Sequence, residues 1–522
     1  MGIVALSLWS VANHPCYKPR VSMLQLSQLG SLIKAVPGVF SRNCQLRPST
    51  RTRFGNRSFG NGMRKSCTST VAATCMALFV LLALPGAAAG DELFPRPDSL
   101  QPAIAFWTRV YSEVDSQAGF IHDNRQLDRV YQTLRFKRYH SPGDQDRIID
   151  QTLQRYRIAL RALAEGKREQ LDDVEQRLLT LWGDEATPAM FKQAADNVRF
   201  QRGQSDRLRD GIISSGAWES YIWQTLRDYD LPAELAALPH VESSYNPLVR
   251  SSAGAAGIWQ FTRFTGKHYL RVDHVVDERL DPHKSTQAAA RLLHRYHAVL
   301  KSWPLTITAY NHGLSGVRRA VRETGTDDIG DIVQQYQGSR FGFASRNFYA
   351  AFLAAVDISS NAESYFGILA RNRPDSYWIV KLPVYLPLSA VTEQLELDAG
   401  VMKALNPALQ RPVWKGNKYV PKDYHLRLPH SVDSEGVTTV FRKIAVADGR
   451  TDQIPDIIYK VQRGDTLSEI AQRYKTNVRE LMNLNNLQSK NHIRSGQSLR
   501  LLSASAAKAV EFASVQLVAI DD

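Results

Sequence analysis

The chain has 522 residues, of which 43% are hydrophobic and 22% are charged, a balance that excludes a disordered or fibrous protein. The formal net charge is +14, but ten Lys and Arg residues fall between Lys18 and Lys65 and no acidic residue precedes Asp91. The rest of the chain therefore carries only four of these charges and shows no nucleic-acid-binding footprint. At this length, about two to four folded units are expected.

Residues 1–89 are predicted to form a leader, with a signal peptide proper at 63–89. A basic pair precedes a short apolar run that ends at Leu84, and small residues follow up to Ala89. This order is typical of a secretory signal that is removed by cleavage. A membrane anchor is the alternative, which the short run and its interruption by a proline and a glycine disfavour. We therefore expect export to the periplasm or cell envelope, with membrane association left open.

All four cysteines of the chain lie before residue 76. Disulfides, thiolate metal sites and a cysteine nucleophile are therefore excluded from the main body of the chain. No metal site and no cofactor is expected.

Two helical units are predicted to follow the leader. In residues 90–206, apolar residues recur at helical spacing, as at Ile149, Leu153 and Tyr156, and no catalytic residue is expected there. Residues 207–370 form the second unit, in which turn signals separate helical segments. Its loops are concentrated around the polar residues considered below, and loops on a rigid frame are where sites usually lie.

The C-terminal part changes to shorter apolar runs with more β-branched and aromatic residues. Residues 376–429 and 456–502 share the same succession of Leu-Ser, Leu-Asn and Leu-Arg-Leu pieces, which indicates an internal duplication. The segment 430–455 between them is predicted to be a linker with a short strand. Residues 503–522 are predicted to be a tail.

A glutamate in the second unit continues an apolar helical stripe. Leu231, Leu235, Leu238 and Glu242 are spaced four, three and four residues apart, and Pro239 is expected to kink the helix just before Glu242. Burial disfavours the charged form of a carboxyl group and raises its pKa, as a general acid near neutral pH requires. The spacing alone also fits a glutamate at a fraying helix end.

Three short blocks give this glutamate its context. They are residues 242–247 (ESSYNP), 254–260 (GAAGIWQ) and 309–313 (AYNHG). Together and in this order they resemble the soluble lytic transglycosylase family, whose catalytic domain is goose-lysozyme-like. The resemblance covers residues 207–369 and implies an all-α lysozyme-like fold within a mainly α protein. It also implies an enzyme that cleaves the glycan strands of peptidoglycan.

Transferred by position, the resemblance makes Glu242 the catalytic acid and base. It also implies five substrate-binding residues: Ser251, Gln260, Tyr310, Asn311 and Tyr349. The late tyrosine of the family falls at Phe348, which lacks the hydroxyl. Either a shift of one residue supplies the hydroxyl from Tyr349, which is our choice, or the aromatic wall acts without it. Further departures from the family pattern, at Ile258, Trp259, Thr262 and His312, are expected to reshape the subsites and to leave the acid in place.

The resemblance implies a reaction without hydrolysis. Glu242 protonates the oxygen between N-acetylmuramic acid and N-acetylglucosamine, then accepts the proton of the C6 hydroxyl as a 1,6-anhydro ring closes. Intramolecular attack has a high effective molarity, so no second carboxylate is obligatory. The nearest candidates for one are predicted to lie on the solvated surface: Asp273, Asp277, Glu278 and Asp281. A muramidase that hydrolyses the same bond and an inactive peptidoglycan-binding protein are the alternatives.

The second repeat closely resembles a LysM domain, a module that binds N-acetylglucosamine-containing glycans. Its signature V-x-x-G-D-T-L begins a pattern of strand, two short helices and strand. The predicted glycan-binding residues are Gly464, Asp465, Thr466 and Leu467. Residues 376–429 lack the Gly-Asp-Thr turn and are expected to be a degenerate LysM-like module. Peptidoglycan strands are thus the predicted partner, and the oligomeric state stays open.

Overall fold

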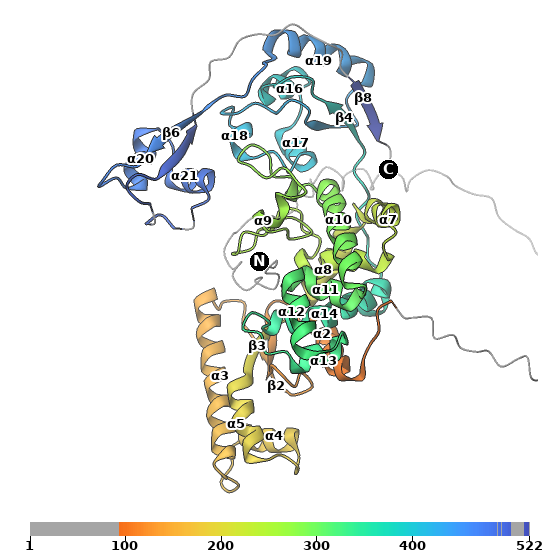
Figure 1. Ribbon diagram of the computed structural model, residues 1–522, viewed down its shortest axis with the longest axis vertical. Coiled ribbons are helices and arrows are strands. Elements are labelled where there is room, and N and C mark those ends of the chain that lie inside the picture. Colours follow the sequence, from red (N-terminus) through yellow and green to blue (C-terminus); the bar gives the residue numbers. More distant parts are fainter. Residues whose placement is uncertain (1–92, 488, 492, 503–515, 521–522) are drawn as a thin grey trace, which may run out of the picture. The chain divides into compact units, whose positions relative to one another are not determined.

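The computed structural model of the chain describes residues 93–487, 489–491, 493–502 and 516–520. The predicted leader and signal peptide lie outside the described residues. The prediction of a mainly α fold is confirmed, because helices dominate Figure 1 and the strands of the described segments form three small antiparallel sheets. None of the helices in these segments is long and apolar enough to cross a membrane.

The N-terminal region, which we predicted as helical, also contains a sheet. Its strands are β1 (Ala118–Asp123), β2 (Val130–Arg135) and β3 (Val198–Arg202), in the order β2-β1-β3. All of β1 is buried: Phe120 belongs to one hydrophobic core and Ile121 to another. Because both faces of this strand are covered, it lacks the alternation of apolar and polar residues from which a strand is predicted.

Three helices pack on this sheet: α3 (Pro142–Ala164), α4 (Asp173–Trp182) and α5 (Pro188–Asn197). α3 and α5 lie side by side in Figure 1 and bury Leu160 and Phe191 between them and the sheet. α3 begins at a capping box in which Ser141 and Asp144 each accept the backbone N–H of the other. The predicted periodicity of α3 thus produces a helix with one buried face.

The largest core belongs to the second unit. Its elements are α6 (Ser205–Ser215), α7 (Glu219–Asp228), η3 (Ala233–Ala237), α8 (Leu238–Ser243), α9 (Arg263–Gly266), η4 (Glu278–Leu280), α10 (Pro282–Leu300), α11 (Trp303–His312), α12 (Leu314–Thr324), α13 (Ile329–Gln335), α14 (Phe343–Ser360) and α15 (Ala362–Phe366). α14 is buried along most of its length and packs against α11 and α8. The site described below is built around it.

One helix of the N-terminal region also belongs to this core. After the short turn η2 (Asp98–Leu100), α2 (Gln101–Ser112) packs along α14, as Figure 1 shows, and against α6. Trp107, Val110 and Tyr111 of α2 are buried in the core. The first helix of the predicted N-terminal region is therefore part of the frame around α14.

The two C-terminal repeats share an arrangement of a strand, two helices and a strand, and the first repeat has one further short helix. The first contains β4 (Tyr377–Lys381), α16 (Leu388–Gln394), α17 (Ala399–Leu405), α18 (Arg411–Trp414) and β5 (His425–Pro429). The second contains β6 (Asp456–Lys460), α20 (Leu467–Arg473), α21 (Val478–Asn485) and β7 (Ser498–Leu502). In each repeat the first and last strands pair antiparallel.

An asparagine at the end of the second helix makes the same contacts in both repeats. The side-chain amide of Asn406 donates to the backbone carbonyl of Arg427 (2.7 Å) and its oxygen accepts the N–H of Arg427 (2.9 Å). Asn485 exchanges the same two bonds with Arg500, at 2.9 and 2.6 Å. This equivalence agrees with the predicted duplication.

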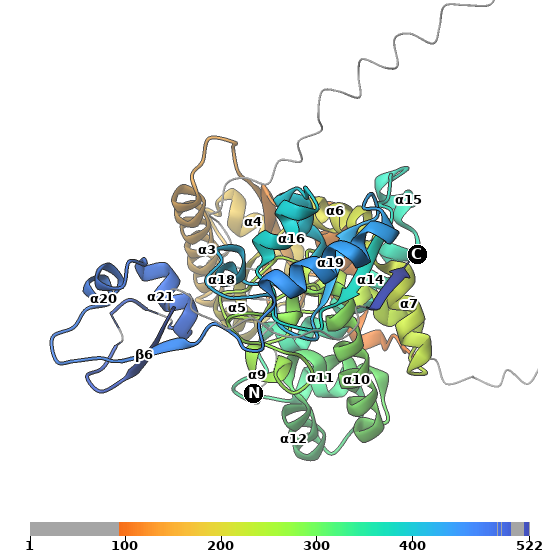
Figure 2. The ribbon, with the colours of Figure 1, turned by 90° about the horizontal axis from the view of Figure 1, so that it is seen from above.

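The structure differs from the prediction in the segments that flank the second repeat. The predicted linker 430–455 contains α19 (Ser434–Asp448), which lies beside α16 in Figures 1 and 2. Val437, Phe441 and Ile444 recur at helical spacing and are buried in the core of the first repeat, which explains why the segment is a helix. In the predicted tail, β8 (Gln516–Ile520) pairs with β4.

Candidate active site

Glu242 lies on α8, a helix of six residues that are all buried. The predicted single helix is divided, because η3 ends at residue 237 and Pro239 occupies the first turn of α8, where its missing N–H costs nothing. α8 ends at Ser244, whose φ of 51° is left-handed. Glu242 therefore lies near the end of a short helix, with the conformationally restricted Pro239 before it and the left-handed residue Ser244 after it.

The carboxyl group of Glu242 is buried without partners. The residue is 2% exposed, and neither carboxylate oxygen has a hydrogen-bond partner in the part of the chain that the structure describes. Burial raises the pKa of Glu242 well above its usual value. This shift favours the protonated form of the carboxyl group, which is the direction that burial on an apolar helical stripe predicts.

The loop 254–260 approaches the backbone of η4 closely. Gly257 has a φ of 80°, and a β-carbon there would lie 1.7 Å from the carbonyl oxygen of Arg279. Only glycine fits at this position. Gln260 also has a positive φ of 45°, and its side-chain amide donates to the carbonyl of Gly257 at 2.8 Å. The amide of Gln260 thus closes the turn that the glycine permits.

The three sequence blocks converge through two hydrogen bonds. The hydroxyl of Ser243 donates to the carbonyl of Ile258 at 2.8 Å, and the hydroxyl of Tyr310 donates to the carbonyl of Trp259 at 2.7 Å. Ile258 and Trp259, two departures from the family pattern, are fully buried. The loop after Gly257 is therefore tied to α8 on one side and to α11 on the other.

The other predicted substrate-binding residues lie around this centre. The side chain of Ser251 accepts the N–H of Ala255 at 3.0 Å at the base of the loop. Asn311 is buried, and its side-chain oxygen accepts the hydroxyl of Ser345, on α14, at 3.0 Å. Tyr310 is also buried, and the pKa of its hydroxyl is raised mainly by burial and next by the charge of Glu242. Substrate contacts of these residues stay predictions.

The hydroxyl of Tyr349 points to a different neighbour. It donates to the carbonyl of Pro95 at 2.8 Å, and Phe348 beside it is fully buried. The substrate contact that we predicted for Tyr349 stays a prediction.

Tyr111 is a residue of this site that the sequence did not indicate. It lies on α2 and is buried. Burial is the larger cause that raises the pKa of Tyr111, and the carboxylate of Glu242 adds to it. No motif surrounds Tyr111, and only the packing of α2 in the core brings it near the acid.

The predicted surface position of the downstream acidic residues is wrong for Asp277 and Asp281, which are 1% and 4% exposed. Asp277 pairs with Arg279 at 2.8 Å and with Arg250 at 3.0 Å. Burial alone would raise the pKa of Asp277, but the hydrogen bonds and charge of Arg279 lower it. Asp281 pairs with Arg427 at 2.6 Å. Both carboxylates are neutralised inside the fold.

The remaining two candidates also have structural partners. Asp273 accepts the backbone N–H groups of Val275 and Val276, each at 2.7 Å, and pairs with Arg271. Glu278 accepts the N–H of Arg271 at 2.7 Å. Each of the four acidic residues therefore holds a turn or a helix end of the loop 271–281.

The four predicted glycan-binding residues of the second repeat build its first turn. Gly464 has a φ of 92°, Asp465 accepts the hydroxyl of Tyr459 and the N–H of Gln462, and Leu467 is buried. Thr466, the fourth of these residues, caps α20 in a capping box with Glu469. Glycan binding by these residues stays a prediction.

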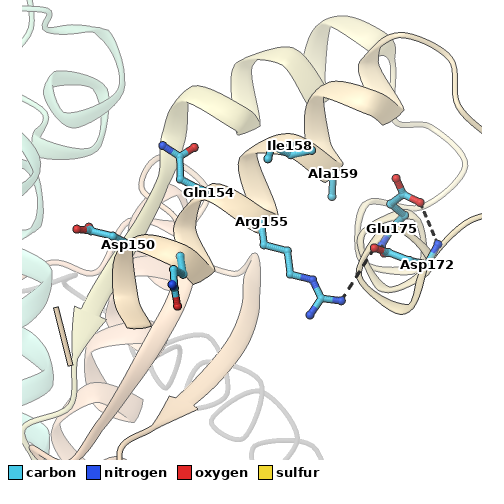
Figure 3. Close-up of a pocket in the computed structure, with 8 residues that line it drawn as sticks. Asp150, Gln154, Arg155, Ile158, Ala159, Asp172 and Glu175 are labelled. Atoms are coloured by element: carbon cyan, nitrogen blue, oxygen red, sulfur yellow. Dashed lines mark hydrogen bonds and ion pairs between the residues drawn. The ribbon is translucent and has the colours of Figure 1, made fainter. Parts of the chain in front are cut away.

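A hollow of about 510 Å³ lies on α3 and α4 (Figure 3). None of the predicted site residues lines it. Two of its acidic groups have partners within the fold: Asp172 caps α4 and lies 4.0 Å from Arg155, and Glu175 accepts a hydrogen bond from the ammonium group of Lys167 at 2.7 Å. Asp172 and Glu175 therefore have structural roles in this hollow.

Comparison with known families gives two matches. Residues 220–333 match the Transglycosylase SLT domain, and residues 459–501 match the LysM domain. The first match contains all three blocks around Glu242, and the second contains the Gly-Asp-Thr turn. Both resemblances predicted from the sequence are confirmed.

The chain is also similar to individual proteins. It is 27% identical over 325 residues to membrane-bound lytic murein transglycosylase D of Escherichia coli K12, covering 60% of this chain and 70% of the relative. A putative tributyltin chloride resistance protein of an Alteromonas species is 33% identical over 103 residues, 19% of this chain and 50% of that protein.

Two solved structures show a weaker likeness. The lytic transglycosylase Slt of Pseudomonas aeruginosa is 16% identical with a TM-score of 0.26, over 43% of this chain and 38% of that one. The 70 kDa soluble lytic transglycosylase of Escherichia coli is 14% identical with the same TM-score, over 44% of this chain and 46% of that one. This chain thus spans less than half of each.

Proposed function

We propose that this chain, which its SLT and LysM domains identify as a peptidoglycan lytic transglycosylase, cleaves the β-1,4 bond between N-acetylmuramic acid and N-acetylglucosamine with Glu242 as its single catalytic carboxyl group. The observation that carries the proposal is the burial of the Glu242 carboxyl group without a hydrogen-bond partner. Both oxygens of Glu242 are buried without a partner among the residues the structure describes, and burial raises its pKa. A general acid must hold a proton near neutral pH.

The reaction needs one carboxyl group in two states. Glu242 gives its proton to the glycosidic oxygen while the bond between C1 of the muramic acid and that oxygen breaks. The C6 hydroxyl of the same sugar attacks C1, and its proton passes to the Glu242 carboxylate. The products are a free N-acetylglucosamine end and a 1,6-anhydro ring, and no water is consumed.

The setting of the other carboxylates supports this reaction over hydrolysis. A hydrolase that inverts or retains configuration uses a second carboxylate as base or nucleophile. The four downstream candidates are held in ion pairs or in bonds to backbone N–H groups. A nucleophile that is already part of the substrate removes the need for such a group.

The predicted roles of the remaining residues complete the proposal. We propose that Ser251, Gln260, Tyr310 and Asn311 contact the glycan beside Glu242, and that the LysM domain binds the sacculus through the turn at residues 464–467. Such a substrate locates the enzyme in the cell envelope. Export by cleavage after Ala89 is part of the proposal and is tested by the mass of the mature protein.

The experiment compares Glu242→Gln with wild type on purified sacculi. The variant keeps the shape of the side chain and loses the acid, so the rate should fall by about 10² to 10⁴. Glu234→Gln, which changes an exposed glutamate of η3, is the matched control and should retain the wild-type rate. Mass spectrometry of the wild-type digest should give muropeptides lighter by one water than those of a muramidase.

Each alternative has its own outcome. Hydrated products from the wild type would establish the muramidase. Sacculi that bind both Glu242→Gln and wild type but are cleaved by neither would establish an inactive binding protein.

A further inference from the structure

Two arginines near the third sequence block have no acidic partner. Arg125 lies in the loop between β1 and β2, and Arg346 lies in the first turn of α14. Neither forms an ion pair with any of the described residues, and Nε of Arg346 is buried without a hydrogen bond. A half-buried cation without a counter-ion is costly to a fold, so this pair differs from the neutralised arginines of the loop 271–281.

The two guanidinium groups reach the same short segment. Nη2 of Arg125 donates to the side-chain oxygen of Gln337 at 2.9 Å, and Nη2 of Arg346 lies 3.5 Å from the backbone carbonyl oxygen of Tyr336. Burial, and next the like charge of Arg125, lower the pKa of Arg346 to about 10, so both groups are charged at neutral pH. Two positive charges that meet on one segment repel each other unless an anion lies between them.

The start of α14 adds to this positive charge. No side chain caps the helix at Gly342, and its first turn contains no acidic residue. The unpaired backbone N–H groups of such a turn carry a positive partial charge. The guanidinium carbon of Arg199, on β3, lies 4.2 Å from the centre of the Phe343 ring in the same turn. Positive groups from three elements thus surround the start of α14.

This positive region adjoins the predicted substrate-binding residues. The hydroxyl of Ser345, next to Arg346, donates to the side-chain oxygen of Asn311 at 3.0 Å and lies 3.2 Å from Nδ1 of His312. The ring of Phe341 connects the two groups, because its centre lies 5.0 Å from that of His312 and 5.8 Å from the guanidinium carbon of Arg346. An anion beside Arg346 can therefore belong to a molecule that also contacts the block 309–313.

We propose that Arg346 and Arg125 form a binding site for a carboxylate of the peptide stem that peptidoglycan carries on N-acetylmuramic acid. The inference rests on the proposed function, because it takes peptidoglycan as the substrate. The sugar ring and the N-acetyl groups are neutral, whereas the stem has free carboxylates. A guanidinium group binds a carboxylate through two parallel hydrogen bonds, so the arginines select the charged part of this substrate.

The test compares two substrates in steady-state kinetics: soluble, uncross-linked glycan strands with native peptide stems, and the same strands after conversion of the stem carboxylates to amides. Wild type should have a KM about tenfold lower for the native strands, because amidation removes the charge-assisted hydrogen bonds. Arg346→Gln should raise the KM for native strands about tenfold, leave kcat unchanged and leave the KM for amidated strands unchanged.

Arg227→Gln is the matched control, since it removes the same charge from an exposed arginine of α7 and should keep the wild-type ratio of the two KM values. Equal KM values of wild type for both substrates would overturn the inference. So would an Arg346→Gln variant that keeps the wild-type ratio, or one in which both KM values rise equally.

Arg125→Gln keeps the test decisive if Arg346→Gln does not fold, because Arg125 is an exposed loop residue. This variant should also reduce the preference for native strands, and an unchanged ratio in the folded variant would contradict the site. Arg346→Lys, which keeps the charge and loses the paired donors, should retain part of the preference.

Failure of the proposed function is a separate result. A Glu242→Gln variant that retains activity would overturn the role of Glu242, but the ratio of the two KM values can be measured for any mechanism of cleavage. If the protein cleaves neither substrate, equilibrium binding of the two strands, each with a fluorescent label, gives the corresponding ratio of Kd values.

Discussion

Arg427 and Asp281 form a buried ion pair through two hydrogen bonds of 2.6 and 3.1 Å, although 146 positions separate them in the sequence. Asp281 also caps α10, because its carboxylate accepts the N–H groups of His283 and Lys284. The pair therefore joins the first repeat to the start of a helix in the SLT domain. Arg500, the equivalent of Arg427 in the second repeat, pairs with Asp456 at 3.3 Å instead.

Replacement of Arg427 by Met should destabilise the protein by about 3 to 5 kcal/mol, because it leaves the Asp281 carboxylate buried without its partner. Combined replacement, Arg427→Met with Asp281→Asn, should restore most of this loss, since Asn also caps a helix. Denaturant unfolding of the two single variants and the double variant measures the coupling. Additive losses would show that the pair does not stabilise the fold.

The same pair predicts a pH dependence of stability. Burial alone would raise the pKa of Asp281, but the charge of Arg427 lowers it from 3.8 to about 2. Because the folded-state pKa is the lower one, the stabilisation is present above pH 3.8 and is lost as pH falls toward 2. In Arg427→Met, stability should instead rise as acid neutralises the isolated carboxylate. Unfolding free energies measured between pH 5 and pH 2 test the opposite slopes.

The close approach of Gly257 to Arg279 predicts different costs for two similar variants. Gly257→Ala places a methyl group 1.7 Å from a backbone oxygen, so it should cost about 4 kcal/mol or more and abolish cleavage. Gly254 has the same φ of 80°, but a β-carbon there would have no neighbouring atom within 4 Å. Gly254→Ala should therefore cost only about 1 to 2 kcal/mol of backbone strain. Thermal unfolding separates them. Equal losses would mean that conformation alone requires glycine at both positions.

The capping box at Thr466 predicts which substitutions of this residue weaken the binding of the LysM domain to sacculi. Thr466→Ala removes the cap of α20 and should lower retention on sacculi, whereas Thr466→Ser keeps a hydroxyl that accepts the N–H of Glu469 and should retain binding. Sedimentation with purified sacculi measures both. Normal binding by Thr466→Ala would show that neither the hydroxyl nor the cap contributes to glycan recognition.

Local patterns explain what could be predicted of this site. Glu242, Gly257 and Tyr310 each lie in a short block, and these blocks are joined by bonds such as that from Tyr310 to Trp259. The resemblance therefore identified the centre of the site without knowledge of the packing. The kink expected at Pro239 is a complete division into η3 and α8 between residues 237 and 238, and this extent was not predicted because the apolar stripe continues across both helices with little change in spacing.

What could not be predicted depends on contacts between distant segments. The charge of Glu242 raises the pKa of Tyr111 only because α2 packs on α14 and α6, and nothing local to Tyr111 in the sequence indicates this packing. The burial of Asp281 depends on Arg427 in another module, so its charged surroundings in the sequence suggested a surface position. Phe441 of α19 shows the converse case, where the helical spacing was present but the polar residues around it favoured a linker.

The burial of Glu242 has a final consequence, which concerns stability rather than rate. Because burial raises its folded-state pKa above the usual 4.5, the protonated group favours the folded state below pH 4.5, and this contribution is lost as pH rises. Glu242→Gln cannot ionise, so at neutral pH it should be more stable than wild type, by about 1 kcal/mol. The difference should shrink below pH 4.5. Unfolding free energies of both proteins at pH 4 and pH 8 measure it, with Glu234→Gln as the exposed control. A variant less stable than wild type at pH 8 would mean that the carboxylate has stabilising partners in solution, and the carboxyl group would then not be poised as a general acid by burial.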